Sequence, residues 1–406
     1  MAFRRIVTMI RLIETPEQCC SCGACSSACP QQAITMTPDS HGTVLPRIDP
    51  EKCIDCGLCV RTCHFKGPKL QAPVATYAAQ RVSKEKISLS ASGGMFAVMA
   101  EHIINSGGTV FGCAMPKDNS GNFSPEIVEC DSMDRLNDLL GSKYLFSDTG
   151  SSYRRVRTLL NQGKTVFYSG LPCQIGGLLG YLRHPYPNLI TIDIICHGAP
   201  VAPIFNSYIR HLESSKKITV HDFRFRVKNK GWGLYYYYYY YTDSHGNRLN
   251  KCAEYIHSIY YRLFLSGAIY RPCCFRCPYA GPQRISDITV GDCWGIEKEH
   301  PDCGSIMDFK DGVSSVIVNS PRGAELLQSC RDALKIYPVD YSSIRKYNAQ
   351  LKAPVRKPAD YQLYMDAFAR QGYKGIIRCY FRPSRWPYLF KESVGRFVKR
   401  KILHIQ

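Results

Sequence analysis

Short apolar segments alternate with amphipathic ones from residue 91 onward. The apolar segments predict strands at residues 109–114, 127–130, 165–169 and 189–195, and the 3.6-residue periodicity predicts helices at 92–105, 154–161 and 173–182. Such alternation is typical of an α/β domain with a largely buried sheet, because helices cover the sheet between successive strands. We predict this domain at residues 75–215, and we interpret residues 71–90, which overlap its beginning, as a connector.

The pattern becomes richer in strands near residue 217. Runs at 220–227 and 234–242 predict two strands, and the turn residues Asp243 to Gly246 predict a hairpin after the second one. Further strands at 286–290 and 314–318 and a helix at 324–334 complete a β-rich part, which we place at residues 216–345. The rings of Tyr235–Tyr241 would alternate between the two faces of a strand. We interpret them as part of a Tyr-rich sheet; a stacking platform for a flavin is the alternative.

The first 70 residues show little apolar periodicity and carry two complete cysteine runs. Each follows the spacing C-x2-C-x2-C-x3-C, and the second repeats the first 34 residues later: Cys19, Cys22, Cys25 and Cys29, then Cys53, Cys56, Cys59 and Cys63. In the two-cluster arrangement, the fourth cysteine of each run ligates the other [4Fe–4S] cluster. We predict a dicluster ferredoxin domain at residues 14–70, with Cys20 as a spectator. Zinc is the alternative, although zinc ligands usually come as separated pairs.

Four later cysteines offer a third ligand set. Two lie at the ends of predicted strands and two form a C-x2-C pair: Cys173, Cys196, Cys274 and Cys277. By spacing alone, a third cluster, a redox-active pair and a zinc site all remain open.

Other polar residues predict an anion site near the strand ends. Ser92, Gly93 and Gly94 precede a predicted helix, whose free N–H groups and dipole favour a phosphate, although an ordinary N-cap has the same sequence. Lys143 lies in a Gly-Ser-Lys-Tyr turn, and Asp292 follows a predicted strand. No G-x-G-x-x-G, Walker A or G-x-S-x-G motif is present.

Composition and charge narrow the function classes. Of 406 residues, 45% are hydrophobic, which excludes a wholly disordered chain, and no run of eighteen apolar residues predicts a membrane span. Twenty-one cysteines without a signal-peptide pattern are typical of a reduced, cytoplasmic chain. The net charge of +19 suggests nucleic-acid binding as a hypothesis. We expect no nucleic-acid partner, because the basic residues are concentrated in the tail and the chain has no known nucleic-acid-binding motif.

The C-terminal residues 346–406 form a basic, aromatic tail. Residues 370–406 hold ten Lys and Arg against one acid, Glu392, and interleave them with Trp386, Tyr388, Phe390 and Phe397. A helix of this composition can lie on an anionic membrane, so peripheral contact with the inner face of the membrane is one interpretation. A helix packed on the protein's own body is the alternative.

In order along the chain, these motifs resemble one known family. The dicluster segment is followed by Ser-Gly-Gly-Met-Phe, Gly-Ser-Lys-Tyr, Ser-Gly-Leu-Pro-Cys-Gln-Ile, Ile-Cys-His-Gly-Ala-Pro, Cys-Phe-Arg-Cys-Pro-Tyr and Asp-Ile-Thr-Val-Gly-Asp-Cys-Trp-Gly. Over residues 14–320, the chain resembles the beta subunit family of coenzyme F420 hydrogenases and dehydrogenases, in the form with an N-terminal ferredoxin domain. The resemblance implies an α+β architecture, with a dicluster ferredoxin-like domain, an α/β flavoprotein domain and an additional β-rich C-terminal part.

The resemblance also implies cofactors and a reaction. It implies FAD held with the help of Ser92, Gly93, Gly94, Lys143 and Asp292, and a third cluster on Cys173, Cys196, Cys274 and Cys277. Electrons from a redox partner protein or a small donor would pass through the clusters to FAD and then to an organic or deazaflavin acceptor. Versions with a fused ferredoxin domain look like those encoded among bacterial polysaccharide-synthesis enzymes. His197 is the candidate proton donor, with a structural hydrogen bond as its alternative role. An electron-transfer or assembly subunit without its own substrate is the alternative function.

Overall fold

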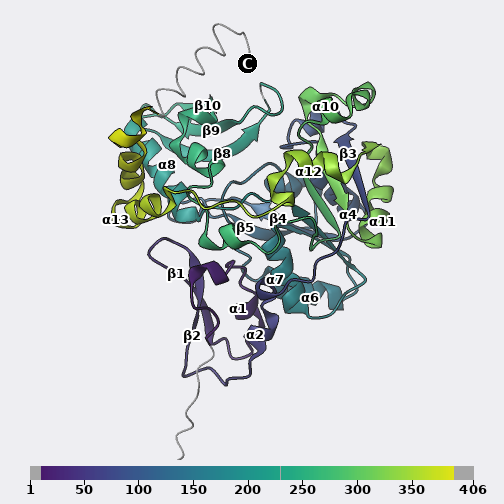
Figure 1. The fold of residues 1–406 in the computed structure, drawn as a ribbon, viewed down its shortest axis with the longest axis horizontal. Helices are drawn as coiled ribbons and strands as arrows, with labels where there is room; N and C mark the ends of the chain where they lie inside the picture. The colour runs from purple at the N-terminus through teal and green to yellow at the C-terminus, as the bar shows by residue number, and fades with distance from the viewer. Residues whose placement is uncertain (1–10, 229, 388–406) are drawn as a thin grey trace, which may run out of the picture.

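A computed structural model describes residues 11–228 and 230–387. It consists of a small cysteine-rich unit at one end, a large mixed sheet with helices on both faces, and a three-stranded sheet beside it (Figure 1). The predicted α+β fold class, with its N-terminal ferredoxin-like region and α/β sheet domain, is confirmed.

The cysteine-rich unit contains two short helices and a hairpin: α1 (Ala24–Ala28), α2 (Leu58–Thr62), β1 (Ile34–Pro38) and β2 (Val44–Ile48). Its buried apolar cluster consists of Leu12, Ile34 and Cys59. A core this small contributes little stabilisation, so contact with the rest of the chain has to support the unit.

The large sheet has eight strands in the order β13-β3-β12-β11-β7-β6-β4-β5. The pairs β4–β6, β6–β7 and β7–β11 are parallel, and the other four pairs are antiparallel. The strands are β3 (Ala75–Arg81), β4 (Thr109–Ala114), β5 (Glu126–Cys130), β6 (Val166–Gly170), β7 (Leu189–Ile194), β11 (Ile288–Asp292), β12 (Ser314–Val318) and β13 (Leu334–Pro338).

Two predictions about this sheet are wrong. The expected connector at residues 71–90 contains β3, an interior strand whose Ala78 and Ala79 are fully buried; small alanines in place of β-branched residues hid it. The helix predicted at residues 324–334 is α11 (Pro321–Ser329), and Leu334 already begins β13.

The predicted division between residues 75–215 and 216–345 does not separate two sheets. Strands β11, β12 and β13 follow residue 216, yet they pair with β7 and β3, which precede it. Local periodicity predicts strands but not their partners, because pairing across long loops is decided by burial of the whole sheet.

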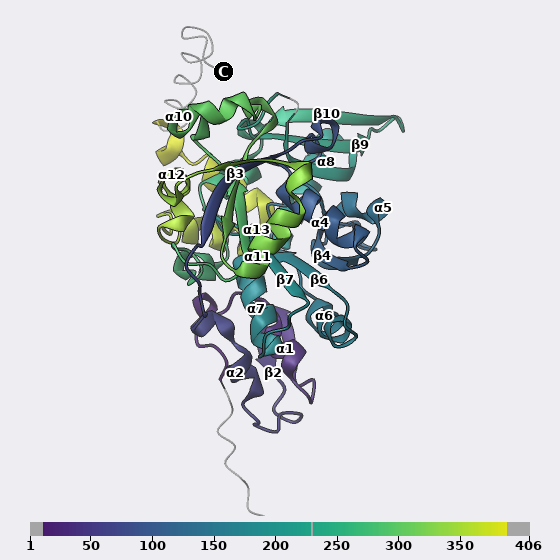
Figure 2. The same ribbon diagram turned by 90° about the vertical axis from the view of Figure 1, so that its right-hand side faces the viewer.

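Helices cover both faces of the sheet (Figure 2). On one face α4 (Met95–Asn105) and α11 pack over β3, β4 and β12, and on the other α6 (Ser152–Asn161) and α7 (Pro172–Leu182) pack over β6 and β7. Shorter helices occur in the connections: α3 (Lys84–Ile87), α5 (Met133–Leu136), α10 (Ile296–Glu299) and α12 (Tyr341–Tyr347). Helix α7 also contacts α1 and α2, so it joins the cysteine-rich unit to the sheet.

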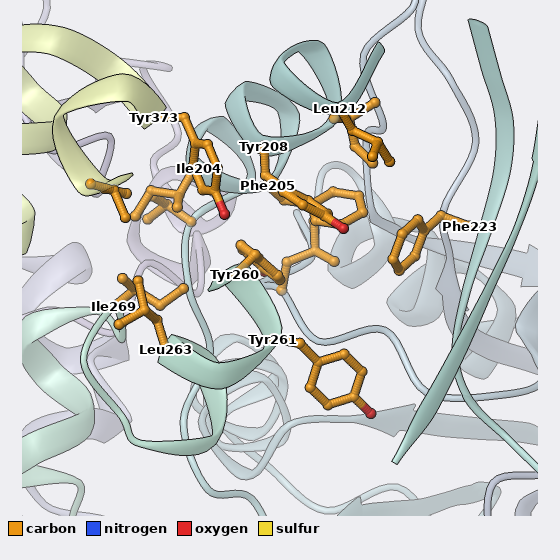
Figure 3. Close-up of a cluster of buried hydrophobic side chains, with 14 of the residues drawn as sticks. Ile204, Phe205, Tyr208, Leu212, Phe223, Tyr260, Tyr261, Leu263, Ile269 and Tyr373 are labelled. Carbon is orange, nitrogen blue, oxygen red and sulfur yellow. The ribbon is translucent and has the colours of Figure 1, made fainter. Parts of the chain in front are cut away.

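The three-stranded sheet packs on an aromatic core (Figure 3). Its strands are β8 (Thr219–Val227), β9 (Tyr236–Thr242) and β10 (Arg248–Glu254), and the helices that cover it are α8 (Ala202–Lys216), α9 (Ile259–Leu265) and α13 (Tyr361–Tyr380). Tyr237 and Tyr239 are buried in this core, whereas Tyr240 is exposed. The alternation expected for a Tyr-rich sheet is therefore confirmed.

The beginning of the predicted tail belongs to the folded body. Helix α13 is interrupted at Gly372, where φ is +59°, and its second half buries Ile376 and Tyr380 in the aromatic core. Trp386 is exposed, whereas Tyr388, Phe390 and Phe397, on which the membrane prediction also depends, lie outside the described residues. Within residues 11–228 and 230–387, no helix is both long enough and apolar enough to cross a bilayer.

Candidate functional site

The first thiol set draws on both cysteine runs. Burial raises the pKa of Cys25, and the neighbouring thiols of Cys22, Cys19 and Cys63 raise it further. Cys63 follows α2 at the end of the second run, and the thiol of Cys22 is also its neighbour. The fold thus brings the fourth cysteine of the second run to the first three cysteines of the first.

The second thiol set is the reciprocal one. Cys29, Cys53, Cys56 and Cys59 line a single cavity of about 20 Å³, together with apolar residues that include Ile34 and Ile48. Cys59 is buried, whereas Cys56 is exposed, so this cavity lies next to solvent.

The two cysteine loops repeat the same backbone conformation. Ser21 and Gly23 have positive φ in the first loop, and Asp55 and Gly57 have it at the equivalent positions of the second. This folds each loop inward, and the Ser21 amide donates to Cys19 Sγ at 3.3 Å. Such N–H···S contacts stabilise negative charge on sulfur, as an iron–sulfur cluster requires.

The donor geometry fits clusters better than single ions. Among the described residues, no three His, Cys, Asp or Glu side chains converge closely enough to hold one metal ion. Tetrahedral zinc needs four ligands around the same ion at about 2.0–2.3 Å, whereas the thiolates of a cubane bind different irons. The cysteine sets therefore fit [4Fe–4S] clusters.

The third thiol set lies between the cysteine-rich unit and the sheet. A cavity of about 30 Å³ is lined by Cys173 at the start of α7, Cys196 after β7, and Cys274 and Cys277 at a turn of 3-10 helix (Pro272–Arg276). Burial raises the pKa of Cys277 to about 12, with the Cys173 thiol as the next cause. Cys196 has the thiols of the other three as electrostatic neighbours.

Helix α7 connects the first and third thiol sets. A Cβ on Gly177 would lie 2.9 Å from Cys22 Sγ, and a Cβ on Gly180 would lie 2.3 Å from the Thr62 carbonyl oxygen. These glycines allow the cysteine-rich unit to pack directly on the helix that begins at Cys173. The Gly-Gly-x-x-Gly spacing was visible in the sequence, but its partner was not.

A larger cavity of about 330 Å³ opens at the carboxyl ends of β6, β7 and β11 and at the beginning of α4. Ligands of open α/β sheets bind in this position. Five of the six residues predicted to bind flavin or transfer protons line it: Ser92, Gly94, Lys143, His197 and Asp292.

Gly93, the sixth, is absent from the cavity wall. Its amide donates to Ser314 Oγ at 2.9 Å, and a Cβ there would lie 2.3 Å from the Ala79 carbonyl oxygen. Gly93 therefore lets the loop before α4 lie flat on β3 and β12.

Lys143 is held in the cavity wall by two backbone carbonyls. Its Nζ donates to Leu140 O at 2.8 Å and to Asp138 O at 3.1 Å. Burial lowers its pKa to about 8. An anion in the cavity would restore the charged form.

Asp292 is engaged by a buried arginine that the sequence did not single out. Arg226 Nη1 and Nη2 donate to its two carboxylate oxygens at 2.5 and 3.2 Å, and Trp232 Nε1 donates at 3.0 Å. Trp232 stacks on Trp294 with ring centroids 4.7 Å apart. Arg226 lies at a β-bulge with φ +54°, and no local pattern predicts that conformation.

One segment forms a wall of both cavities. Cys196, His197 and Gly198 line the third thiol cavity and also the larger cavity. Gly198 has φ +131°, and a Cβ there would lie 2.3 Å from the Tyr270 ring. Enclosure lowers the pKa of His197, and its imidazole makes no hydrogen bond to the described residues, so the structural hydrogen bond expected as its alternative role is absent from this part of the chain.

Comparisons with known proteins agree with the expected family resemblance. Residues 163–343 match the family model for the C terminus of the "Coenzyme F420 hydrogenase/dehydrogenase, beta subunit", and residues 18–66 match the "4Fe-4S dicluster domain". No curated protein matches the chain. A solved structure entitled "Xenon derivatization of the F420-reducing [NiFe] hydrogenase complex from Methanosarcina barkeri" is 16% identical, covers 77% of this chain and 91% of its own, and has a TM-score of 0.44.

Proposed function

We propose that this chain is an iron–sulfur flavoprotein oxidoreductase. The matches to the 4Fe–4S dicluster domain and to the C terminus of the coenzyme F420 hydrogenase/dehydrogenase beta subunit support this. Electrons enter at the dicluster domain, pass to a third [4Fe–4S] cluster on Cys173, Cys196, Cys274 and Cys277, and reach FAD in the larger cavity. An organic or deazaflavin acceptor then takes them, and polysaccharide biosynthesis is the proposed setting.

The wall shared by the two cavities carries this proposal. A ligand of the third cluster, Cys196, would lie directly beside whatever fills the larger cavity. Cys56 of the second thiol set is exposed to solvent. The thiol sets therefore form a chain from the protein surface to an organic-ligand cavity, as an electron-transfer enzyme requires.

The residues of the larger cavity suit a flavin nucleotide. Its volume of about 330 Å³ lies in the range of about 300–1,000 Å³ that small-molecule sites have. The first amides of α4 and the Lys143 ammonium would bind the phosphates, and the ion pair of Arg226 with Asp292 would keep the ring end rigid. When bound, the flavin would supply the conversion of single electrons into a hydride.

His197 would move the proton. It lies in the shared wall beside Cys196, so it is next to both the third thiol set and the cavity. A donor in this place can protonate a reduced ligand without opening the cavity to water.

Purification without oxygen followed by iron and small-molecule analysis tests the proposal. We expect roughly 12 iron atoms per chain, four for each cubane, and release of FAD detected by mass spectrometry. Replacing both Cys274 and Cys277 by serine should remove about four iron atoms and leave the dicluster domain loaded. Iron without any flavin would contradict the oxidoreductase and favour the alternative, an electron-transfer or assembly subunit.

A further inference from the structure

Arg271 lies between the first and third thiol sets and is almost completely buried, with 2% of its surface exposed. Its Nε donates to the Ala199 carbonyl at 3.3 Å, its Nη1 donates to the Cys20 carbonyl, and its guanidinium covers the Phe146 ring at 3.5 Å. Its Nη2 approaches Cys173 Sγ at 4.0 Å.

Arg271 differs from the other buried arginines in its partners. In the described part of the chain, Arg81, Arg226 and Arg284 each pair with a carboxylate, at 2.6, 2.5 and 3.3 Å respectively. No described carboxylate lies within 4 Å of Arg271. A buried guanidinium without a counter-charge is strongly unfavourable, so negative charge must come from another group.

The groups around Arg271 that can carry negative charge are sulfurs. Its electrostatic neighbours are the thiols of Cys273, Cys274, Cys173 and Cys20. The positive charge of Arg271 also acts on Cys19 of the first set, whose pKa it lowers against the larger effect of burial. Two of the four residues of the third set, Cys173 and Cys274, are thus among them. A cluster held by four thiolates carries net negative charge and gains one more unit on reduction.

Cys20 lies next to both sets. Its thiol is buried, and the thiols of Cys173 and Cys22 are its electrostatic neighbours. Its sulfur therefore lies beside one residue of the first set and one residue of the third, and Arg271 binds its backbone carbonyl.

We propose that Arg271 is a positioning residue that raises the reduction potential of the third cluster and so draws electrons inward from the first. The inference rests on the third cluster of the proposed function. In the step concerned, one electron leaves the first cluster, which is oxidised, and enters the third, which is reduced; no bond forms or breaks. The fixed positive charge stabilises the extra negative charge of the reduced third cluster more than that of the first, because it lies nearer to Cys173 and Cys274.

A redox titration of the anaerobic holoprotein, followed by electron paramagnetic resonance, tests this. The signal of the third cluster is first assigned as the one lost when Cys274 and Cys277 are both serine. Arg271→Gln should lower the reduction potential of the third cluster by at least ~59 mV, which is a tenfold decrease in the equilibrium constant of its one-electron reduction. Arg271→Lys, which keeps the positive charge, should keep the potential close to that of the wild type. Arg276→Gln is the matched control: it removes the same charge from the same motif but at an exposed position.

The outcomes separate this inference from the proposed function. If the wild-type protein contains only about eight iron atoms and shows no signal of a third cluster, both the inference and the proposed function are refuted. Arg271→Gln with full iron and an unchanged potential would overturn the inference alone. If Arg271→Gln loses the third cluster, retention of both cluster and potential in Arg271→Lys supports charge compensation, whereas loss in both variants refutes it.

Discussion

Replacing Gly180 by alanine tests whether the contact between α7 and the cysteine-rich unit requires a glycine at this position. In a helix with free space around it, alanine is better than glycine by about 1 kcal/mol, so the substitution would stabilise the chain. Here a Cβ would lie 2.3 Å from the Thr62 carbonyl oxygen and 3.2 Å from the Cβ of His64. Ordinary contact begins at 3.4 Å, and the obstacle is backbone, which no change of rotamer can move.

The two effects have opposite signs, and their sizes decide the result. The unit would have to retreat by roughly 1 Å, and overpacking of this kind costs about 1–3 kcal/mol. After the gain in helix propensity is subtracted, we expect a net destabilisation of up to about 2 kcal/mol. The displaced residues flank Cys63, so the first thiol set should loosen before the sheet unfolds.

Anaerobic denaturant unfolding of the holoprotein, with iron release recorded alongside helix content, measures this. Gly180→Ala should release iron at a lower denaturant concentration than wild type. Leu179→Ala is the control, because it lies on the same helix, is partly exposed and adds no atom toward the unit. If Gly180→Ala is as stable as wild type or more stable, the contact between α7 and the unit does not limit this position.

Other predictions concern the larger cavity and the metal. Asp292→Asn leaves Arg226 buried without its counter-charge and should destabilise the fold by about 3 kcal/mol in thermal unfolding, whereas no change would mean that the pair is dispensable. Because the pKa of Lys143 is lowered to about 8, its positive charge is lost as the pH rises through that value. Flavin affinity measured by fluorescence should therefore fall between pH of about 7 and about 9, and Lys143→Gln should remove that dependence. His197→Gln should lower turnover while iron and flavin content stay unchanged; unaltered turnover would remove it from proton transfer. Chelation of iron should make residues 11–70 sensitive to protease while the sheet resists, since their apolar core is small; equal resistance would show that metal does not hold them.

Much of the candidate site could be predicted where chemistry depends on local spacing. Three cysteines with two residues between each pair can reach one cluster from a single loop. Both runs form matching loops, with positive φ at equivalent positions. The predicted strands at residues 109–114 and 314–318 coincide with β4 and β12. The helix before Asn105 was also expected, although it begins at Met95, after the flat loop of Gly93.

Residues whose role depends on distant partners escaped prediction. Arg226 reaches the cavity only because a bulge turns its backbone, and Arg271 lies among sulfurs of its own segment and of two distant ones. Cys20 looked superfluous beside the regular spacing, yet it contacts Cys173, more than one hundred residues away in the chain. Strand β3 was missed because alanine has little preference for strands, and it is held by its neighbours in the sheet.

The amino-acid order by itself determined the local units: two cysteine loops able to bind clusters, a series of buried strands and a helix with glycines along one face. Spacing and periodicity act over a few residues, so they can be read directly from the chain. The tertiary structure decided which of these units meet. The adjacency of the third thiol set to the larger cavity and the placement of the buried Arg271 guanidinium beside that set come from long-range packing, in which burial of apolar surface selects one arrangement.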